Sequence, residues 1–245
     1  LLLISLIILN MKIITNFSSN YSKKKRPLKD IRFIIIHYTG MQSEIASIKR
    51  LKDPKSKVSC HYLIRRNGNI IQMVNEKNIA WHAGKSRWKN FMNLNKNSLG
   101  IELVNKGHEF GYQNFTNQQI QSLISLCKLL KRKYTIKKEN FLGHSDIAPL
   151  RKIDPGEKFP WKRLSINGLG KWYKKDNKNL IINNKKIKIL FFKNLKKLGY
   201  NYFRVRERSF KDKKIIKSFQ QHYLPKNVTG KIDQKTYKIS HFLTN

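Results

Sequence analysis

A histidine, a lysine and an aspartate stand close together in one loop-like stretch of this chain. His144, Lys152 and Asp154 fall within eleven residues, in a segment that two prolines and a glycine interrupt. Such a segment forms a loop, and loops carry chemistry more often than packing does. Zinc accepts one imidazole and one carboxylate from a loop of this kind and then needs a further protein ligand. The stretch therefore predicts part of a metal site that a second imidazole completes.

The second imidazole has a candidate at the end of an apolar run. Residues 33–36 read Phe-Ile-Ile-Ile, which is typical of a strand covered on both faces, and His37 follows them. A single histidine at a strand end is more often a hydrogen-bonded core residue, so the prediction depends on the combination. His37, His144 and Asp154 would supply three ligands and leave a fourth position for water, as in catalytic zinc sites.

Several segments of the chain, taken in order, resemble the zinc-dependent N-acetylmuramoyl-L-alanine amidases (type 2 amidases), a fold shared with peptidoglycan recognition proteins. The resemblance runs from about residue 31 to residue 172. Besides the loop at 144–154, its motifs are Ile-Ile-Ile-His-Tyr-Thr (34–39), Val-Ser-Cys-His-Tyr-Leu-Ile (58–64), Ala-Trp-His-Ala-Gly (80–84), Asn-Leu-Asn (93–95) and Ser-Leu-Gly-Ile-Glu-Leu-Val-Asn (98–105).

The resemblance implies Zn²⁺ as cofactor, with His37, His144 and Asp154 as its ligands. It also implies Glu102 as general base and Lys152 as the residue that stabilises the charged intermediate. The implied reaction is hydrolysis of the amide between N-acetylmuramic (or anhydro-N-acetylmuramic) acid and L-alanine in peptidoglycan or muropeptides, for wall turnover or recycling. The residues agree with these roles, because Lys152 stands two positions before Asp154, and residues two apart in an extended loop point the same way.

Further residues of the same segments are candidates for contact with the substrate. An aromatic side chain beside a glycine can form a wall for a sugar ring, and a guanidinium can bind a peptide carboxylate. We therefore expect substrate contacts from Tyr38, Trp81, His82, Asn95 and Arg151. We expect ordinary structural, packing or surface roles for the remaining histidines: His61, His108, His222 and His241.

The charge of the chain leaves other function classes open. Fifty-two basic and 14 acidic residues give a formal net charge of +38, which implies attraction to a polyanion. A nucleic-acid-binding protein fits the charge, yet no recognised nucleic-acid motif is present, and wall polymers satisfy the same electrostatics. A non-catalytic peptidoglycan recognition protein on the same fold is the other alternative, and loss of a zinc ligand would indicate it. We expect peptidoglycan or muropeptides as partner, no specific nucleic acid, and a monomer.

The start of the chain bears on its location. Leu1–Leu9 is apolar but too short to span a membrane. It resembles the core of a signal peptide, although it lacks a basic start and a clear cleavage site. We expect a cell-envelope or periplasmic protein without a transmembrane anchor; a cytoplasmic one is the alternative if Met11 is the initiator. Cys60 and Cys127 fit small core residues.

The surrounding patterns predict an α/β fold in which helices flank a mixed central sheet and the metal lies at one sheet edge. Asn67-Gly68-Asn69 marks a hairpin turn, and Thr116 is the expected N-cap of a helix that ends near Tyr134. We divide the chain into an apolar segment with a basic, solvated lead-in (1–26), a catalytic domain (27–173), a linker (174–186) and a helical domain (187–245).

The C-terminal domain is predicted to contain three helices. They cover Ile187–Leu198, Asp212–Tyr223 and a stretch that begins at Asp233, a natural N-cap. Residues 218–236 are similar to the small peptidoglycan-binding domain of wall hydrolases; the alternative is a plain helical cap on the catalytic domain. As a binding module, residues 187–245 should be removable with little loss of hydrolysis of small soluble substrates.

Overall fold

The computed structural model describes residues 12–174 and 184–245. Leu1–Leu9 and most of the expected linker lie outside these residues. Within them, ten strands are found: β1 (Ile13–Thr15), β2 (Tyr21–Ser22), β3 (Phe33–Tyr38), β4 (Tyr62–Ile64), β5 (Ile70–Gln72), β6 (Ile79–Ala80), β7 (Arg87–Trp88), β8 (Phe91–Met92), β9 (Ser98–Leu103) and β10 (Phe141–Gly143).

Six of these strands form the central sheet, in the order β1-β5-β4-β9-β3-β10. The β4–β5 pair is antiparallel, and the other four pairs of neighbours are parallel. The expected mixed sheet is therefore confirmed, as is the hairpin around Gly68. The helices are α2 (Glu44–Lys52), α3 (Asn117–Lys133), α4 (His144–Ile147), α5 (Trp161–Ile166), α6 (Asn184–Leu198), α7 (Asp212–Tyr223) and α8 (Gln234–Phe242). Short 3-10 helices cover Leu28–Asp30, Pro54–Ser56, Leu94–Asn97 and Lys138–Asn140.

The two faces of the central sheet pack against different parts of the molecule. Side chains alternate along a strand, so Ile34 and Ile36 of β3 face one side and Phe33, Ile35 and His37 the other. The first side packs against the apolar stripe of α3, which includes Leu123. Thr116 caps α3 through the backbone N–H of Gln119, as its sequence predicts. The opposite face therefore carries the candidate site.

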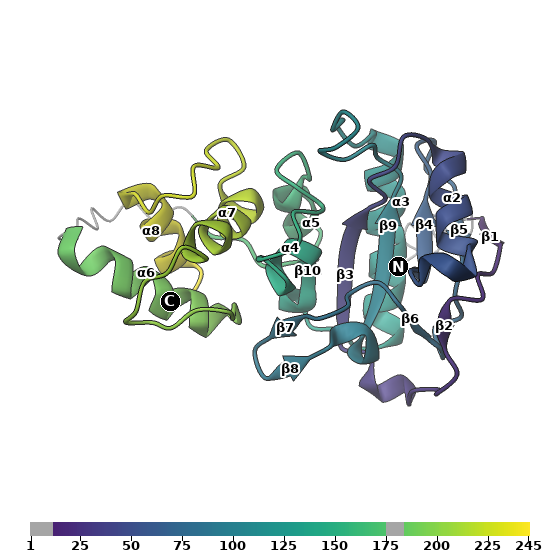
Figure 1. Ribbon diagram of the computed structural model, residues 1–245, viewed down its shortest axis with the longest axis horizontal. Coiled ribbons are helices and arrows are strands. Elements are labelled where there is room, and N and C mark those ends of the chain that lie inside the picture. Colours follow the sequence, from purple (N-terminus) through teal and green to yellow (C-terminus); the bar gives the residue numbers. More distant parts are fainter. Residues whose placement is uncertain (1–11, 175–183) are drawn as a thin grey trace.

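The C-terminal helices form a lobe beside α4 and α5 (Figure 1). All three predicted helices occur, although α6 begins at Asn184, before the predicted start at Ile187. The Asp233 side chain caps α8 by accepting from the Thr236 N–H. One continuous apolar core joins this lobe to the sheet domain, since Phe191 and Phe219 share a cluster with Ile147 and Ala148. Removal of the lobe would expose part of this shared core, and whether residues 187–245 can be removed without loss of hydrolysis stays a prediction.

In the basic lead-in, Lys23, Lys24 and Lys25 are exposed as expected, whereas Arg26 is buried, and the sheet domain begins before residue 27. The edge strand β1 pairs in parallel with β5. Arg26 is 6% exposed, and its guanidinium donates to the carbonyl oxygens of Glu76, Asn95 and Ser98. Buried carbonyl oxygens require donors, and the guanidinium supplies them here, which offsets the cost of burying its charge.

No helix in residues 12–174 or 184–245 has the length and apolar character that crossing a membrane requires.

Candidate active site

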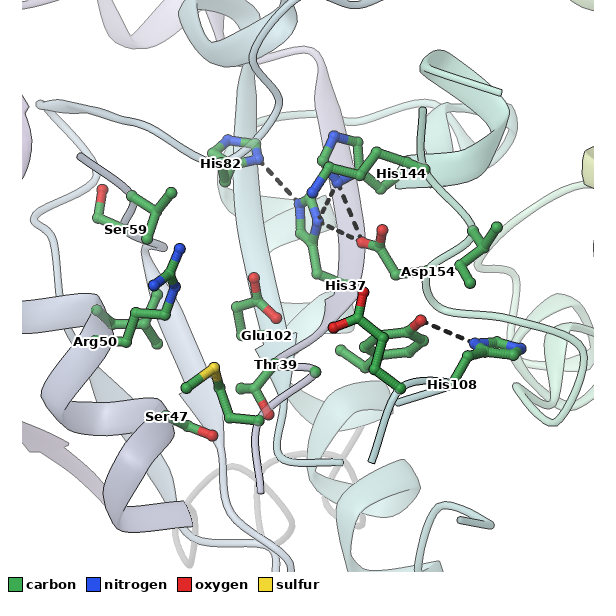
Figure 2. Close-up of a pocket in the computed structure, with 18 of the residues that line it drawn as sticks. His37, Thr39, Ser47, Arg50, Ser59, His82, Glu102, His108, His144 and Asp154 are labelled. Carbon is green, nitrogen blue, oxygen red and sulfur yellow. Dashed lines mark hydrogen bonds and ion pairs between the residues drawn. The ribbon is translucent and has the colours of Figure 1, made fainter. Parts of the chain in front are cut away.

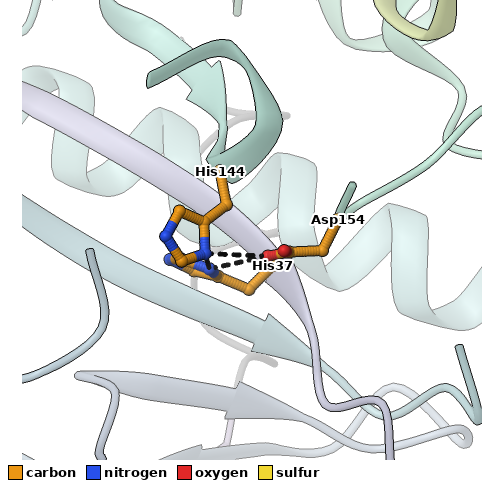
Figure 3. A group of neighbouring side chains, drawn as sticks. All are labelled: His37, His144 and Asp154. Atoms are coloured by element: carbon orange, nitrogen blue, oxygen red, sulfur yellow. Dashed lines mark hydrogen bonds and ion pairs between the residues drawn. The ribbon is translucent and has the colours of Figure 1, made fainter. Parts of the chain in front are cut away.

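Three side chains meet at the carboxyl ends of β3 and β10. His37 lies near the end of β3, His144 begins α4 directly after β10, and Asp154 lies in the loop that follows α4. The Nδ1 atoms of the two histidines are 3.0 Å apart, and Asp154 Oδ2 lies 2.9 Å from His37 Nδ1 and 3.1 Å from His144 Nδ1 (Figure 3). All three residues are buried.

This triangle fits a metal ion. Ligand atoms about 2.0–2.1 Å from a tetrahedral zinc lie about 3.3 Å from each other, close to the spacing seen. Burial and the neighbouring His144 lower the pKa of His37 to about 4, so its ring is neutral, as a metal ligand must be. Burial alone would raise the pKa of Asp154, but His144 and His37 hold it below its usual range. Two imidazoles and one carboxylate are a donor set that zinc accepts.

The remaining ring nitrogens of both histidines are held by neighbouring groups. His37 Nε2 lies 3.1 Å from His82 Nδ1, and His82 Nε2 lies 3.3 Å from Ser98 Oγ, which donates to the Leu94 carbonyl. His144 Nε2 lies 3.1 Å from the Ala83 carbonyl. If each Nε2 carries the proton and donates it to these partners, the lone pair of each Nδ1 points into the triangle. Such partners orient the ligands and raise their basicity.

His82 and Ala83 therefore form a second layer behind the triangle, and Asn95 fixes that layer. The Asn95 side-chain oxygen accepts from the backbone N–H groups of both residues, at 3.1 and 2.6 Å. A glycine is required at position 100, because a Cβ there would lie 2.4 Å from His82 Cγ. The motif Ala-Trp-His-Ala-Gly thus positions the ligands from behind.

Glu102 lines the same cavity as the triangle (Figure 2). Lys152 lines it as well. Glu102 pairs with His37 across parallel strands β9 and β3, so the two side chains share one face of the sheet. Its Oε2 is enclosed and has no hydrogen-bond partner among the described residues. Burial, with a smaller contribution from Asp154, raises the pKa of Glu102 to about 8. An unpaired, poorly solvated carboxylate beside a metal site is a candidate proton acceptor.

The cavity has a volume of about 690 Å³, enough for a sizeable ligand, and residues from distant segments line it. Tyr38 and Trp81 contribute aromatic surface, and Arg50 of α2 contributes a cation. The Tyr38 hydroxyl lies 2.8 Å from His108 Nδ1, while His108 Nε2 lies 3.1 Å from Glu157. Burial raises the pKa of Tyr38, so its hydroxyl stays protonated and donates to His108. These hydrogen bonds from Tyr38 through His108 to Glu157 hold the loop around residue 108 at the rim of the cavity.

The structure brings most of the predicted residues together. The three predicted ligands, both predicted catalytic residues, Tyr38, Trp81, His82 and Arg151 all border the cavity. Asn95 is the exception: it is not among the lining residues, because its amide oxygen is engaged by backbone N–H groups. His82 has both ring nitrogens engaged. Arg151 borders the cavity but donates to the backbone carbonyls of Ala83 and Lys85.

Three residues at or behind the cavity were not predicted from the sequence, whereas the structural role expected for one histidine is found. Ser98 and Arg50 gave no separate signal, since a serine in a strand or a charge on a helix is usually structural or solvated. His108 was expected to have an ordinary role, but its ring lies 2.8 Å from the Tyr38 hydroxyl at the cavity. The structural role expected for His61 is confirmed: its Nδ1 accepts from the Gly100 N–H.

Comparisons with known proteins place the chain among relatives of one kind. The family described as N-acetylmuramoyl-L-alanine amidase matches residues 27–157. The N-acetylmuramoyl-L-alanine amidase AmiD of Escherichia coli K12 is 35% identical over 233 residues, which cover 87% of this chain and 82% of AmiD. The 1,6-anhydro-N-acetylmuramyl-L-alanine amidase AmpD of Haemophilus influenzae is 36% identical over 164 residues, 60% of this chain and 86% of AmpD.

Solved structures agree with these sequence matches. The structure of Escherichia coli AmiD in complex with the substrate anhydro-N-acetylmuramic acid-L-Ala-D-gamma-Glu-L-Lys superposes with a TM-score of 0.75 at 31% identity. The match covers 92% of each chain.

Proposed function

This chain belongs to the N-acetylmuramoyl-L-alanine amidase family, and from that premise we propose how its site hydrolyses the amide between an N-acetylmuramoyl group and L-alanine. We propose that His37, His144 and Asp154 hold one zinc ion. Muropeptides, including those with an anhydro-muramoyl end, are the substrate class, which the names of the relatives and the AmiD complex support. The convergence of three buried donor atoms beside the unpaired Glu102 carries the proposal.

We assign each step of the amide hydrolysis to particular groups in the cavity. When bound, zinc supplies a Lewis acid that lowers the pKa of water from 15.7 to about 7. Glu102 accepts a proton from the attacking water and passes it to the leaving amine, a role that its raised pKa suits near neutral pH. Lys152 faces the cavity and stabilises the negative oxygen that develops at the attacked carbonyl.

We propose that His82 acts as a positioning residue, not as a substrate contact. It holds His37 from behind through the Nε2 contact and is itself held by Ser98. Substrate contact is proposed for Tyr38 and Trp81, which offer aromatic surface to a sugar or lactyl group. Arg151 is proposed to steady the backbone near Ala83, to which it donates.

Two further parts of the proposal concern the wall. The C-terminal helices are proposed to contact peptidoglycan, which the resemblance of residues 218–236 supports, and retention on purified sacculi at high salt tests this. We propose that the protein acts at the cell envelope, because its net charge of +38 favours anionic wall polymers. We propose that it acts there as a monomer.

Metal analysis and product identification test the function together. The wild-type protein should contain one zinc per chain and release L-alanyl peptides from purified sacculi or from soluble anhydromuropeptide, as mass spectrometry would detect. His144→Ala should lose the zinc, whereas Glu102→Gln should keep it and lose turnover. Full zinc occupancy in His144→Ala would contradict the ligand assignment.

A zinc-containing wild type that binds but never cleaves either substrate would favour the alternative, a recognition protein on this fold. The complete donor set and the unpaired carboxylate of Glu102 argue for the amidase.

A further inference from the structure

A buried carboxylate outside the metal triangle joins the two halves of the molecule. Asp146 lies on α4, two residues after His144, and is 1% exposed. It accepts three hydrogen bonds: from the Gly143 N–H at 2.8 Å, from the Tyr200 hydroxyl at 2.5 Å and from His222 Nδ1 at 2.8 Å. Two of these donors belong to the C-terminal lobe, in which His222 is part of α7 and Tyr200 follows α6.

The same short helix is held by the lobe at its backbone. Ser218 of α7 donates to the Ser145 carbonyl at 2.8 Å, and the Ser145 N–H donates to the Asp154 carbonyl at 2.8 Å. The peptide groups next to Ser145 therefore connect the lobe, His144 and Asp154. A helix of four residues has little stability of its own, so its position depends on such contacts.

The side chain of His222, which donates to Asp146, is itself buried and packed against the catalytic part of the molecule. The His222 ring stacks on Trp161 of α5, with centroids 3.9 Å apart and planes 11° from parallel. His222 is 3% exposed, and its Nε2 has no hydrogen-bond partner among the described residues. An unsatisfied buried nitrogen costs free energy, so the contact that Nδ1 makes with Asp146 must offset that cost.

We propose that Tyr200 and His222 are positioning residues for the metal site, so that the C-terminal lobe completes the scaffold of the catalytic centre. They hold Asp146, and Asp146 holds the turn that presents His144. Without them the carboxylate would keep Gly143 as its one remaining donor among those described, and a buried carboxylate short of donors draws in water or moves outward. This inference rests on the zinc site proposed above.

Full-length variants that remove single donor groups test the coupling. Tyr200→Phe removes the hydroxyl alone. His222→Phe keeps a flat ring for stacking on Trp161 and removes the Nδ1 donor. Tyr237→Phe is the matched control, because Tyr237 is buried in the same core cluster but lies on α8, and it is not a donor to Asp146.

The measurement is metal binding itself, with zinc alone as the probe. Competition with a chelator gives the zinc dissociation constant, and the visible absorption spectrum of the cobalt-loaded protein reports ligand geometry. In the double variant that combines Tyr200→Phe with His222→Phe, we expect about tenfold weaker zinc binding and an altered cobalt spectrum. Tenfold is the lower end of the loss that follows when residues bonded to metal ligands are replaced. Tyr237→Phe should match the wild type in both.

The outcomes separate this inference from the proposed function. If the wild type binds no zinc, the zinc site fails and the coupling fails with it. If the wild type binds zinc and the double variant has the same affinity and spectrum, only the coupling is overturned. Thermal unfolding shows whether the double variant is folded; if it is not, the same two measurements on each single variant decide the question.

Discussion

The contribution of Glu102 to the free energy of unfolding of the metal-free protein should fall as pH rises. The substitution Glu102→Gln should remove this pH dependence. The structure encloses Oε2 without a partner, and burial raises the pKa of Glu102 from 4.5 to about 8. The folded state thus holds this proton more tightly than the unfolded state does. The stabilising contribution is fully present below pH 4.5 and is lost as pH rises through about 8.

The magnitude follows from the size of the shift. One pKa unit corresponds to about 1.4 kcal/mol, so the full shift corresponds to at most about 5 kcal/mol. The cavity admits water to part of the carboxylate, which makes this figure an upper value. Between about pH 5 and pH 8, one proton gives a slope of about 1.4 kcal/mol per pH unit. Glutamine has nearly the same shape and does not titrate there.

Denaturant unfolding at a series of pH values, with a chelator present, measures this slope. The stability of Glu102→Gln minus that of the wild type should rise with pH and level off above about pH 8, whereas groups common to both proteins cancel. A difference that stays constant with pH would show that Glu102 is solvated and refute the reasoning. With zinc bound the nearby cation favours the carboxylate, so the rise should shrink.

Three further predictions concern the surroundings of the site. Lys152→Ala should keep its zinc and lose about 10²–10³ in turnover, as steady-state kinetics with parallel metal analysis would show; unchanged turnover would remove Lys152 from the mechanism. Gly100→Ala should displace His82 and weaken zinc binding about 10–100-fold in chelator competition, and an unchanged affinity would show that His82 does not support His37. Deletion of residues 187–245 should expose the shared core and yield an aggregating or zinc-poor protein, as sedimentation and metal analysis would detect; a soluble, zinc-loaded and active fragment would show that the lobe is separable after all.

The sequence alone was enough to predict features that depend on local geometry. An unbroken apolar run predicts a strand buried on both faces, and β3 has this form with His37 near its end. The caps at Thr116 and Asp233 mark helix starts, because a side chain there satisfies a backbone N–H within three residues. The sequence also indicated the three candidate metal ligands, because the motifs that carry them resemble those of a zinc amidase family in their order along the chain.

Tertiary structure decided the partners of the buried polar groups. Arg26 resembles a solvated cation in sequence but is buried and donates to the carbonyl oxygens of Ser98 and Glu76. Asn95 resembles a substrate contact but holds the backbone behind the metal ligands. His222 resembles an ordinary packing residue, and its link to Asp146 spans 76 positions. Periodicity and capping act over a few residues and can be read from the chain, whereas the partner of a buried donor depends on which distant segments the fold brings together.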